Sequence, residues 1–346
     1  MESDMRSLIT GGAGFIGIQT ADRLLGRGEE VVLLDNLSRK GASKNLAWLK
    51  ERHGDSPFEK ADVRDFTRMK DIIERYRPLD TVFHFAAQVA VTSSVQNPKE
   101  DFDINALGTL NVLESIRQAG LDPVFLFTST NKVYGGMEEV EVTEEETRYR
   151  YVSLPHGISE TAPLDFHSPY GCSKGAADQY VRDYHRIYGL RTLVFRNSCI
   201  YGPRQFGIED QGWVAWFIIA WLQKHPLTIY GNGKQVRDLL YIDDLIDGML
   251  MAIERQDHTQ GQIYNMGGGA DYSLSIWKEC GPMLEELVGS PIPVKHDDWR
   301  PGDQVVYVSD IRKAARDFDW RPSVAPREGI AKLYAWASEN AHLFSE

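Results

Sequence analysis

The N-terminal segment constrains the fold of this chain more than any other stretch. Residues 6–17, RSLITGGAGFIG, have the pattern of a short buried strand, a glycine turn and the start of a helix. Gly11 permits the tight turn, Gly14 lets the backbone approach a pyrophosphate, and Gly17 lets the helix pack closely. A second apolar run, VVLLD, ends in Asp35, at the separation typical of a dinucleotide-binding βαβ unit. The alternative is a structural βαβ unit that binds no nucleotide.

Asp35 also indicates which dinucleotide such a unit would bind. A carboxylate at this position accepts hydrogen bonds from the adenosine ribose hydroxyls and repels a 2′-phosphate, which favours NAD. Arg39 and Lys40 follow closely, so NADP stays an open alternative. The other candidate cofactor-binding residues lie in the glycine turn, after the second strand or at later strand ends: Phe15, Ile16, Asn36, Asp62, Val63, Ala86, Ala87, Gln88, Thr128 and Asn197. For Asp62, a cap at the end of a strand is a competing interpretation.

Short apolar strands continue to alternate with helices after this unit. Residues 81–88, 124–130 and 191–198 are predicted strands, and residues 101–120 form one strongly periodic helix. This alternation predicts an α/β fold with a doubly wound parallel sheet of the Rossmann type, whose ligands bind at the carboxyl ends of the strands. The Glu-rich residues 135–167 break the pattern, and we expect a long loop that folds over the site.

The regular alternation stops after residue 196. We expect an NAD-binding Rossmann domain over residues 1–196, to which residues 236–258 return. A smaller mixed C-terminal domain, formed by residues 197–235 and 259–346, is expected to bind the substrate.

The overall composition excludes several classes of protein. The chain has 346 residues, of which 42% are apolar and 25% charged, as in ordinary globular proteins. A net charge of −12 disfavours nucleic acid as a partner, so an anionic ligand would need its own arginines. No apolar run approaches the ~20 residues of a membrane span, and the start of the chain leads directly into a strand, so we expect no membrane contact and no signal peptide. Three scattered cysteines predict neither a metal site nor a disulfide framework and favour the cytoplasm.

Tyr170 and Lys174 are the first candidate catalytic residues. They are four residues apart in SPYGCSK, so on a helix they share one face. A phenol loses its proton near pH ~10 in water, and we expect the neighbouring ammonium to lower that pKa. The spacing is common by chance, and on its own it leaves a purely structural role open.

Six motifs occur in one order along nearly the whole chain: TGGAGFIG at 10–17, TNKVYG at 130–135, YGCSK at 170–174, YGPR at 201–204, RDLLYIDD at 237–244 and RPGD at 300–303. Together they resemble the extended short-chain dehydrogenase/reductase family that acts on nucleotide sugars. Longer strings, such as DFHSPYGCSKGAADQY and LDNLSRKGASKNLAWL, resemble the branch of that family that epimerises CDP-linked sugars.

The resemblance implies roles for individual residues. Thr130, Tyr170 and Lys174 would be catalytic. Residues that would hold NAD are Gly11, Gly14, Gly17, Asp35, Asp62, Tyr170 and Lys174. Residues that would contact the nucleotide sugar are Thr130, Asn131, Lys132, Arg204, Arg237 and Arg300. Guanidinium groups suit diphosphate oxygens, although a surface salt bridge is the alternative for Arg237 and Arg300. The chain departs from the family at Cys199, where an Asn is usual.

The resemblance also implies a homodimer, in which the helices at 101–119 and 171–188 pair across the interface. Burial of the same apolar stripes in the core of one chain is the alternative.

The residues after Thr130 distinguish the reactions of this family. Relatives that remove water from the sugar carry Asp-Glu there, whereas this chain has Asn131-Lys132, which argues against a 4,6-dehydratase. We therefore expect an epimerase that inverts C2 of a CDP-3,6-dideoxyhexose through a transient 2-keto intermediate. The alternatives are 4-epimerisation of a nucleotide hexose and a catalytically silent nucleotide-sensing module.

Overall fold

A computed structural model describes residues 5–300 and 303–344, so Pro301 and Gly302 of the RPGD motif lie outside the described residues. The chain divides into two compact units. The first comprises Met1–Thr130, Ser168–Arg196 and Ile246–Ile263, and the second comprises Asn131–His167, Asn197–Leu245 and Tyr264–Glu346. Residues 131–167 thus group with the second unit, although we expected them within a domain over residues 1–196. That the first domain binds NAD and the second binds the substrate stays a prediction.

The first unit contains most of the alternating strands and helices. In chain order these are β1 (Arg6–Thr10), α1 (Phe15–Gly26), β2 (Glu30–Asp35), α2 (Ala42–His53), β3 (Phe58–Lys60), α3 (Phe66–Arg75), β4 (Thr81–His84), α4 (Val91–Gln96), α5 (Pro98–Phe102), the π-helix η1 (Asp103–Leu107), α6 (Gly108–Gln118), β5 (Val124–Thr130), α7 (Ser168–Tyr188), β8 (Thr192–Asn197), α9 (Ile242–Glu254), α10 (Gln256–Thr259) and β12 (Gln262–Met266).

A seven-stranded sheet has the order β12-β8-β5-β4-β1-β2-β3. The pairs β1–β2, β1–β4, β2–β3 and β4–β5 are all parallel. Its strands are apolar along their length because helices cover both faces of such a sheet. The α/β fold with a Rossmann-type parallel sheet is therefore confirmed.

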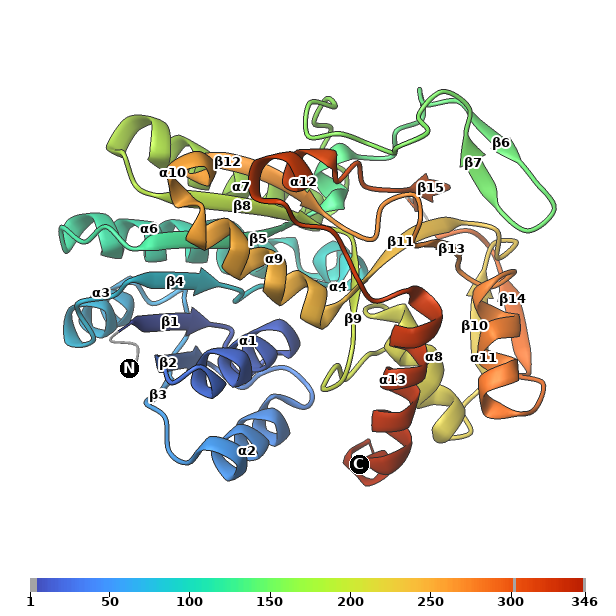
Figure 1. Cartoon of the computed structure of the whole chain (residues 1–346), viewed down its shortest axis with the longest axis horizontal. Helices are drawn as coiled ribbons and strands as arrows, with labels where there is room; N and C mark the ends of the chain where they lie inside the picture. The colour runs from blue at the N-terminus through green and yellow to red at the C-terminus, as the bar shows by residue number, and fades with distance from the viewer. Residues whose placement is uncertain (1–4, 301–302, 345–346) are drawn as a thin grey trace. The chain divides into compact units, whose positions relative to one another are not determined.

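Different helices cover the two faces of the sheet. On one face, side chains of α3, α6 and α7 form a core cluster with alternate strand residues, among them Leu8, Val82 and Phe127. Helices α1 and α9 lie in front of the strands in Figure 1, and an ion pair joins Arg23 of α1 to Asp247 of α9. The carboxyl ends of the strands are thereby left as the edge at which polar residues gather.

The predicted helix at 101–120 is interrupted by one feature that its periodicity did not indicate. Residues Asp103–Leu107 form a π-helix between α5 and α6. The side chain of Asn105 in this turn bonds to Gln88 and Ser173, and the Thr109 hydroxyl donates to the Asn105 carbonyl at 2.6 Å. These long-range bonds accompany the wider turn, which is common at functional sites.

The second unit has shorter and more irregular elements. They are the 3₁₀-helix η2 (Asn131–Tyr134), β6 (Val142–Glu144), β7 (Tyr149–Tyr151), β9 (Cys199–Tyr201), α8 (Trp213–Leu222), β10 (Leu227–Tyr230), β11 (Val236–Tyr241), β13 (Ser273–Ser275), α11 (Cys280–Val288), β14 (Val294–Asp297), β15 (Val306–Tyr307), α12 (Arg312–Phe318), α13 (Pro326–Glu339) and the 3₁₀-helix η3 (Ala341–Leu343).

Strand β11 is the centre of this unit. It pairs with β9 and β15 in parallel and with β13 antiparallel. The predicted loop at 135–167 is wrong in part, because β6 and β7 form an antiparallel hairpin that is visible in Figure 1. The rest of that segment packs by its apolar side chains with Val236 and Tyr307, and the Ile158 amide donates to the Val308 carbonyl at 2.8 Å.

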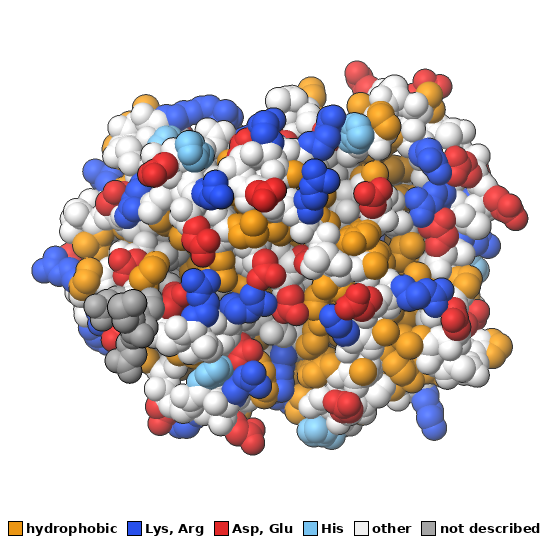
Figure 2. Space-filling model, in the orientation of Figure 1, with side chains coloured by type: hydrophobic (Ala, Val, Ile, Leu, Met, Phe, Trp, Pro, Cys, Tyr) orange, Lys and Arg blue, Asp and Glu red, His pale blue; other side chains and the backbone are white. Residues whose placement is uncertain are grey.

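The surface agrees with the charge pattern of the sequence. Figure 2 shows Lys and Arg side chains interspersed with Asp and Glu over the face it presents, without a basic field of the kind that nucleic acid requires. Among the described residues, no helix combines the length and apolar character needed to cross a membrane.

Candidate active site

The glycine turn between β1 and α1 has the geometry that its sequence predicts. Gly11 has φ +67°, and a Cβ there would lie 2.7 Å from the Ala86 nitrogen. A Cβ on Gly17 would lie 2.2 Å from the Gly11 carbonyl oxygen, so helix and turn pack too closely for any side chain. Gly14 occupies the N-cap of α1 and, as a glycine, makes no side-chain capping hydrogen bond. The first amides of α1 therefore face the turn as donors for an anion.

Asp35 lies buried at the end of β2 with both oxygens directed by backbone. Its Oδ1 accepts from the Leu37 amide at 2.7 Å, and its Oδ2 accepts from the Ala13 amide at 3.1 Å. Burial raises the pKa of Asp35, and these backbone amides oppose the rise. The Gly14 amide also donates to this carboxylate, whose two oxygens offer about four lone-pair sites and so keep acceptor capacity for a ribose hydroxyl.

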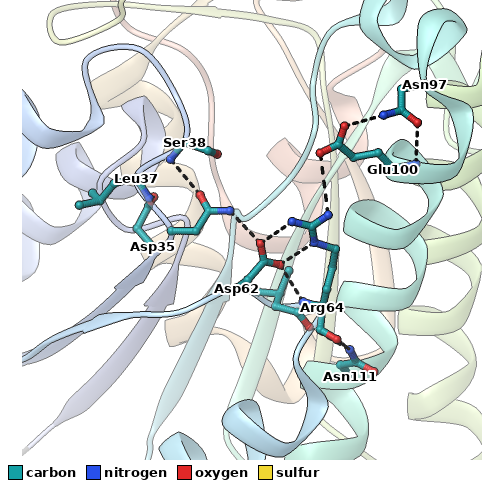
Figure 3. A network of polar contacts seen from close by, with 10 residues as sticks. Asp35, Leu37, Ser38, Asp62, Arg64, Asn97, Glu100 and Asn111 are labelled. Atoms are coloured by element: carbon teal, nitrogen blue, oxygen red, sulfur yellow. Dashed lines mark hydrogen bonds and ion pairs between the residues drawn. The ribbon is translucent and has the colours of Figure 1, made fainter.

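Asp62 and Asn36 form a polar network after β3 (Figure 3). Arg64 donates to both oxygens of Asp62 at 2.9 and 2.8 Å, and the Asn36 amide donates at 2.9 Å. The hydrogen bond from Arg64 is the main reason that the pKa of Asp62 falls to about 2. Figure 3 shows Arg64 between Asp62 and Glu100, whose carboxylate lies 3.8 Å from the guanidinium. Both proposed interpretations of Asp62, ligand contact and strand-end cap, fit this anion.

The other predicted cofactor residues lie along the strand ends. Ala86, Ala87 and Gln88 follow β4 and are half-buried, as are Phe15 and Ile16 of α1. The Gln88 side chain, however, is bonded to Asp101 at 3.0 Å and to the Ala90 carbonyl at 2.7 Å.

Val63 and Asn197 have contrasting surroundings. The Val63 side chain belongs to the core, so a ligand contact would have to come from its backbone. In the part of the chain that the structure describes, the buried Oδ1 of Asn197 has no hydrogen-bond partner. A buried acceptor of this kind is usually satisfied, so Asn197 suits a ligand that donates a hydrogen bond.

Thr130, Tyr170 and Lys174 come together within the first unit. Thr130 ends β5 and is hydrogen-bonded to the Tyr170 side chain. Lys174 lies one turn further along α7, where its Nζ donates to the Thr128 carbonyl at 2.7 Å and lies 4.1 Å from the centre of the Phe127 ring. The fold thus places Thr130, which the family resemblance indicated, beside the pair that local spacing indicated.

The protonation of this pair differs from the expectation. Burial raises the pKa of Tyr170 to about 12, and the Thr130 hydrogen bond opposes that rise only in part. Burial also lowers the pKa of Lys174 to about 7, although the negative charges of Asp178 and Asp101 act to raise it. The expected lowering of the Tyr170 pKa by Lys174 is therefore absent here, since removal from water outweighs the neighbouring charge.

Within the second unit, three predicted substrate residues surround one carboxylate. Arg237 donates to Asp303 at 2.6 Å, and the Lys132 Nζ lies 3.7 Å from the same oxygen. Arg237, Lys132 and Arg300 all lower the pKa of Asp303, although burial opposes them. The Arg300 guanidinium lies 3.9 Å from the centre of the Tyr230 ring. Arg300 is also paired with Asp210 at 3.4 Å. Lys132, Arg237 and Arg300 thus supply guanidinium and ammonium groups of the kind that suit a diphosphate.

The remaining predicted substrate residues have other surroundings. Asn131 is buried and donates to Gln304 at 3.0 Å. The Arg204 guanidinium lies 5.7 Å from the centre of the Trp336 ring. Cys199 accepts a hydrogen bond from Trp213 Nε1 at 3.5 Å, and burial raises its thiol pKa. A neutral thiol here cannot donate as strongly as the usual Asn amide.

The sequence did not indicate two buried groups beside Tyr170 and Lys174. His84 bridges the hydroxyls of Thr10 and Thr109 at 2.7 and 2.9 Å, and Asp101 is bonded to Ser173. These partners lie far apart in the chain, so no local spacing could reveal them. Among the described residues, the exposed Glu138 and Asp165 and the half-buried His167 have ligand atoms close enough together to hold a metal ion. Such acidic groups are common without an ion.

Comparison with known proteins places the chain among enzymes of nucleotide sugars. A family model described as GDP-mannose 4,6 dehydratase matches residues 8–333. The chain is 45% identical to CDP-paratose 2-epimerase of Salmonella typhi over 339 residues, which cover 96% of this chain and 99% of the relative.

Two solved structures have the same fold over almost their full length. The UDP-glucose 4-epimerase of Thermus thermophilus, in complex with NAD, is 34% identical, has a TM-score of 0.80 and covers 96% of this chain and 98% of its own. The dTDP-glucose 4,6-dehydratase of Streptomyces venezuelae, with NAD bound, is 28% identical, has a TM-score of 0.83 and covers 99% of each chain.

Proposed function

Because this chain belongs to the GDP-mannose 4,6 dehydratase family of extended short-chain dehydrogenases/reductases, we propose that it is an NAD-dependent nucleotide-sugar epimerase. Its substrate is a CDP-linked 3,6-dideoxyhexose, whose C2 it inverts through a transient 2-keto sugar. The observation that carries the proposal is the Thr130–Tyr170 hydrogen bond with the buried Lys174 one turn away. The 45% identity to a CDP-paratose 2-epimerase over nearly the whole chain supports C2 as the inverted carbon and CDP as the nucleotide.

The residues of the first unit fit NAD. The glycine turn and the uncapped N-terminus of α1 would hold the pyrophosphate, and the two oxygens of Asp35 would accept from the adenosine ribose. When bound, NAD supplies a reversible hydride acceptor and the positive charge of its nicotinamide ring.

Tyr170 would move the proton of the sugar hydroxyl. Burial and the high pKa make its phenol a proton donor at neutral pH, and a cation beside it would favour the phenolate that takes a proton. Thr130 would bond to the same sugar oxygen and orient it. Lys174, anchored to the Thr128 carbonyl, would hold its ammonium near the reacting atoms. The same groups serve the return step, which reduces the ketone from its other side.

Dehydration of the sugar needs a carboxylate base where this chain has Asn131 and Lys132. Neither an amide nor an ammonium can remove a carbon-bound proton. Asp303 is a nearby carboxylate in the same unit, but Arg237 and Lys132 already bond to it and lower its pKa. We assign Lys132, Arg237 and Arg300 to the substrate diphosphate instead.

The second candidate is 4-epimerisation of a nucleotide hexose, because a relative of that activity shares the fold at 34% identity. The same residues would oxidise the sugar in both reactions. The carbon of the bound sugar that faces Tyr170, C2 or C4, would therefore determine which of them is inverted.

The active form is proposed to be a homodimer. Phe102 of α5 is 54% exposed, and Tyr180 and Ile187 of α7 are 49% and 65% exposed. Tyr180 and Ile187 are seven residues apart and share one face of the helix, whereas Val181 and Tyr184 face the core. Exposed apolar residues on adjacent helices favour pairing with a second copy. The cytoplasm is the proposed compartment, since three scattered cysteines, an odd number, do not suit a disulfide framework.

The experiment is direct. Purified protein is incubated with a CDP-linked 3,6-dideoxyhexose and, separately, with UDP-glucose, and the products are identified by NMR. Inversion at C2 supports the proposal. Inversion at C4 of UDP-glucose alone would transfer the assignment to the second candidate, and a protein that binds nucleotide without converting either sugar would be a sensing module.

A further inference from the structure

One buried carboxylate next to the catalytic pair has no part in the reaction proposed above. Asp101, on α5, is 1% exposed. Its Oδ2 accepts a hydrogen bond from the Ser173 hydroxyl, and its Oδ1 accepts from Gln88 Nε2 at 3.0 Å and Asn105 Nδ2 at 3.2 Å. We call these four residues the Asp101 network. All four belong to the first unit.

Ser173, Gln88 and Asn105 surround the Asp101 carboxylate with hydrogen-bond donors. Burial raises the pKa of Asp101, and the hydrogen bonds from Ser173 and Gln88 and the charge of Lys174 oppose that rise and favour the anion. Asn105 also donates to Ser173 at 3.0 Å and to the Gln88 carbonyl at 3.0 Å, so the network is closed. A buried carboxylate that is hydrogen-bonded on both oxygens is fixed in place.

The Asp101 network joins the elements that carry the reaction. Ser173 lies between Tyr170 and Lys174 on α7, and its hydroxyl is also 3.2 Å from the Tyr170 carbonyl. Gln88 follows β4 in the segment expected to line the cofactor, and Asn105 lies in the π-helix. The carboxylate thus connects a cofactor-lining segment, a distorted helix turn and the catalytic helix at one point.

We propose that Asp101 is a positioning residue of this enzyme: its carboxylate fixes Ser173 and Gln88 and supplies the negative charge that both Tyr170 and Lys174 face. The inference rests on the proposed function for its consequence in catalysis. Its electrostatic part concerns the chain's own residues and can be measured without substrate.

The direction of the electrostatic effect follows from the groups around each member of the pair. Lys174 faces the carboxylates of Asp178 and Asp101, which raise its pKa against burial, and lies near the neutral His84. Tyr170 faces Asp101, which raises its pKa, and Thr130 and Arg39, which lower it. Removal of the Asp101 charge therefore lowers the pKa of Lys174 and of Tyr170 alike.

The test compares two amide substitutions on the same helix. In Asp101→Asn the carbonyl oxygen still accepts from Gln88 and Asn105, and the new amide can donate to Ser173, so the shape is kept and the charge is lost. Glu100→Gln is the matched control, because it removes one charge from the adjacent but exposed position. The titration of Lys174 is followed by NMR of protein labelled at the lysine ε-carbon and assigned with Lys174→Met.

The inference predicts that Asp101→Asn moves the Lys174 midpoint to lower pH and that Glu100→Gln does not. In Asp101→Asn, both limbs of the pH profile of kcat should move to lower pH. Ser173→Ala should lower kcat without moving either limb. An unchanged Lys174 midpoint in Asp101→Asn would overturn the inference. If the Asn variant does not fold, Asp101→Ser carries the same prediction. A lowered midpoint in a protein that converts no CDP-sugar would support the inference and contradict the proposed function.

Discussion

The Nζ of Lys174 donates to the carbonyl oxygen of Thr128 at 2.7 Å, which anchors helix α7 to the end of strand β5. The same strand ends in Thr130, the hydrogen-bond partner of Tyr170. One strand therefore holds both members of the proposed catalytic pair: its backbone carbonyl binds the lysine, and its Thr130 hydroxyl binds the tyrosine. The pair does not depend on a direct contact between phenol and ammonium.

Tyr170→Phe should lower kcat by about 10²–10⁴-fold and leave NAD bound, because only the hydroxyl that moves the proton is lost. Tyr180→Phe is the matched control, since Tyr180 lies on the same helix and is exposed. Steady-state kinetics and the NAD content of each purified variant give the two results. Tyr170→Phe protein with more than about a tenth of wild-type kcat would remove Tyr170 from the proton transfer.

Cofactor selectivity should depend on Asp35. Cofactor-free protein is expected to bind NAD more tightly than NADP in a calorimetric titration, because the carboxylate accepts from ribose hydroxyls and repels a phosphate. Asp35→Ser should narrow that preference, while Glu30→Gln, at the start of the same strand, should not change it. Equal or tighter binding of NADP by the unaltered protein would contradict this assignment.

Lys132→Ala should raise the KM for the nucleotide sugar by about 10–100-fold, the equivalent of one charge-assisted hydrogen bond to a phosphate oxygen. Arg237 and Arg300 lie around the same carboxylate, so part of the positive cluster would persist. Lys278→Ala is the control, because Lys278 is an exposed lysine of the same unit. Unchanged kinetic constants for Lys132→Ala would show that this lysine does not contact the substrate.

His84 should make the folded state sensitive to mild acid. Burial lowers its pKa from 6.5 to about 3, so between these values the unfolded chain binds a proton that the folded chain does not. Stability is then lost as the pH falls below 6.5, at about 1.4 kcal/mol per pH unit.

Urea unfolding at pH about 6.5 and about 5 measures this loss, which should be about 2 kcal/mol smaller in His84→Gln than in the wild type. His225→Gln, an exposed histidine, should keep the wild-type loss. The same loss in all three proteins would show that His84 is not the group that titrates.

The sequence predicts those parts of the fold and site that depend on local spacing. The glycine turn, the acid that ends β2 and the Tyr170/Lys174 pair each follow from residues within one turn or one βαβ unit. Burial of Tyr170 was not predictable in this way, because it depends on how α4, α5 and β5 pack around α7, and it reverses the expected pKa change.

Long-range polar contacts account for most of what the sequence did not show. Asp101 and Ser173 are 72 residues apart, and Thr10 and His84 are 74 apart. The π-helix at Asp103–Leu107 has an ordinary helical pattern in sequence, and only its contacts with Gln88 and Ser173 distinguish it. The hairpin within residues 135–167 was obscured by its glutamates, which favour solvent exposure over any particular backbone.

Isotope tracing at C2 tests the central claim most directly. The purified enzyme is given a CDP-linked 3,6-dideoxyhexose with deuterium at C2, and in a parallel reaction unlabelled substrate is turned over in heavy water. If C2 is oxidised and then reduced by the same cofactor, the inverted product keeps its deuterium in the first reaction and gains none at C2 in the second. Incorporation of solvent deuterium at C2 would contradict the account, because the hydrogen would then have left as a proton rather than as a hydride.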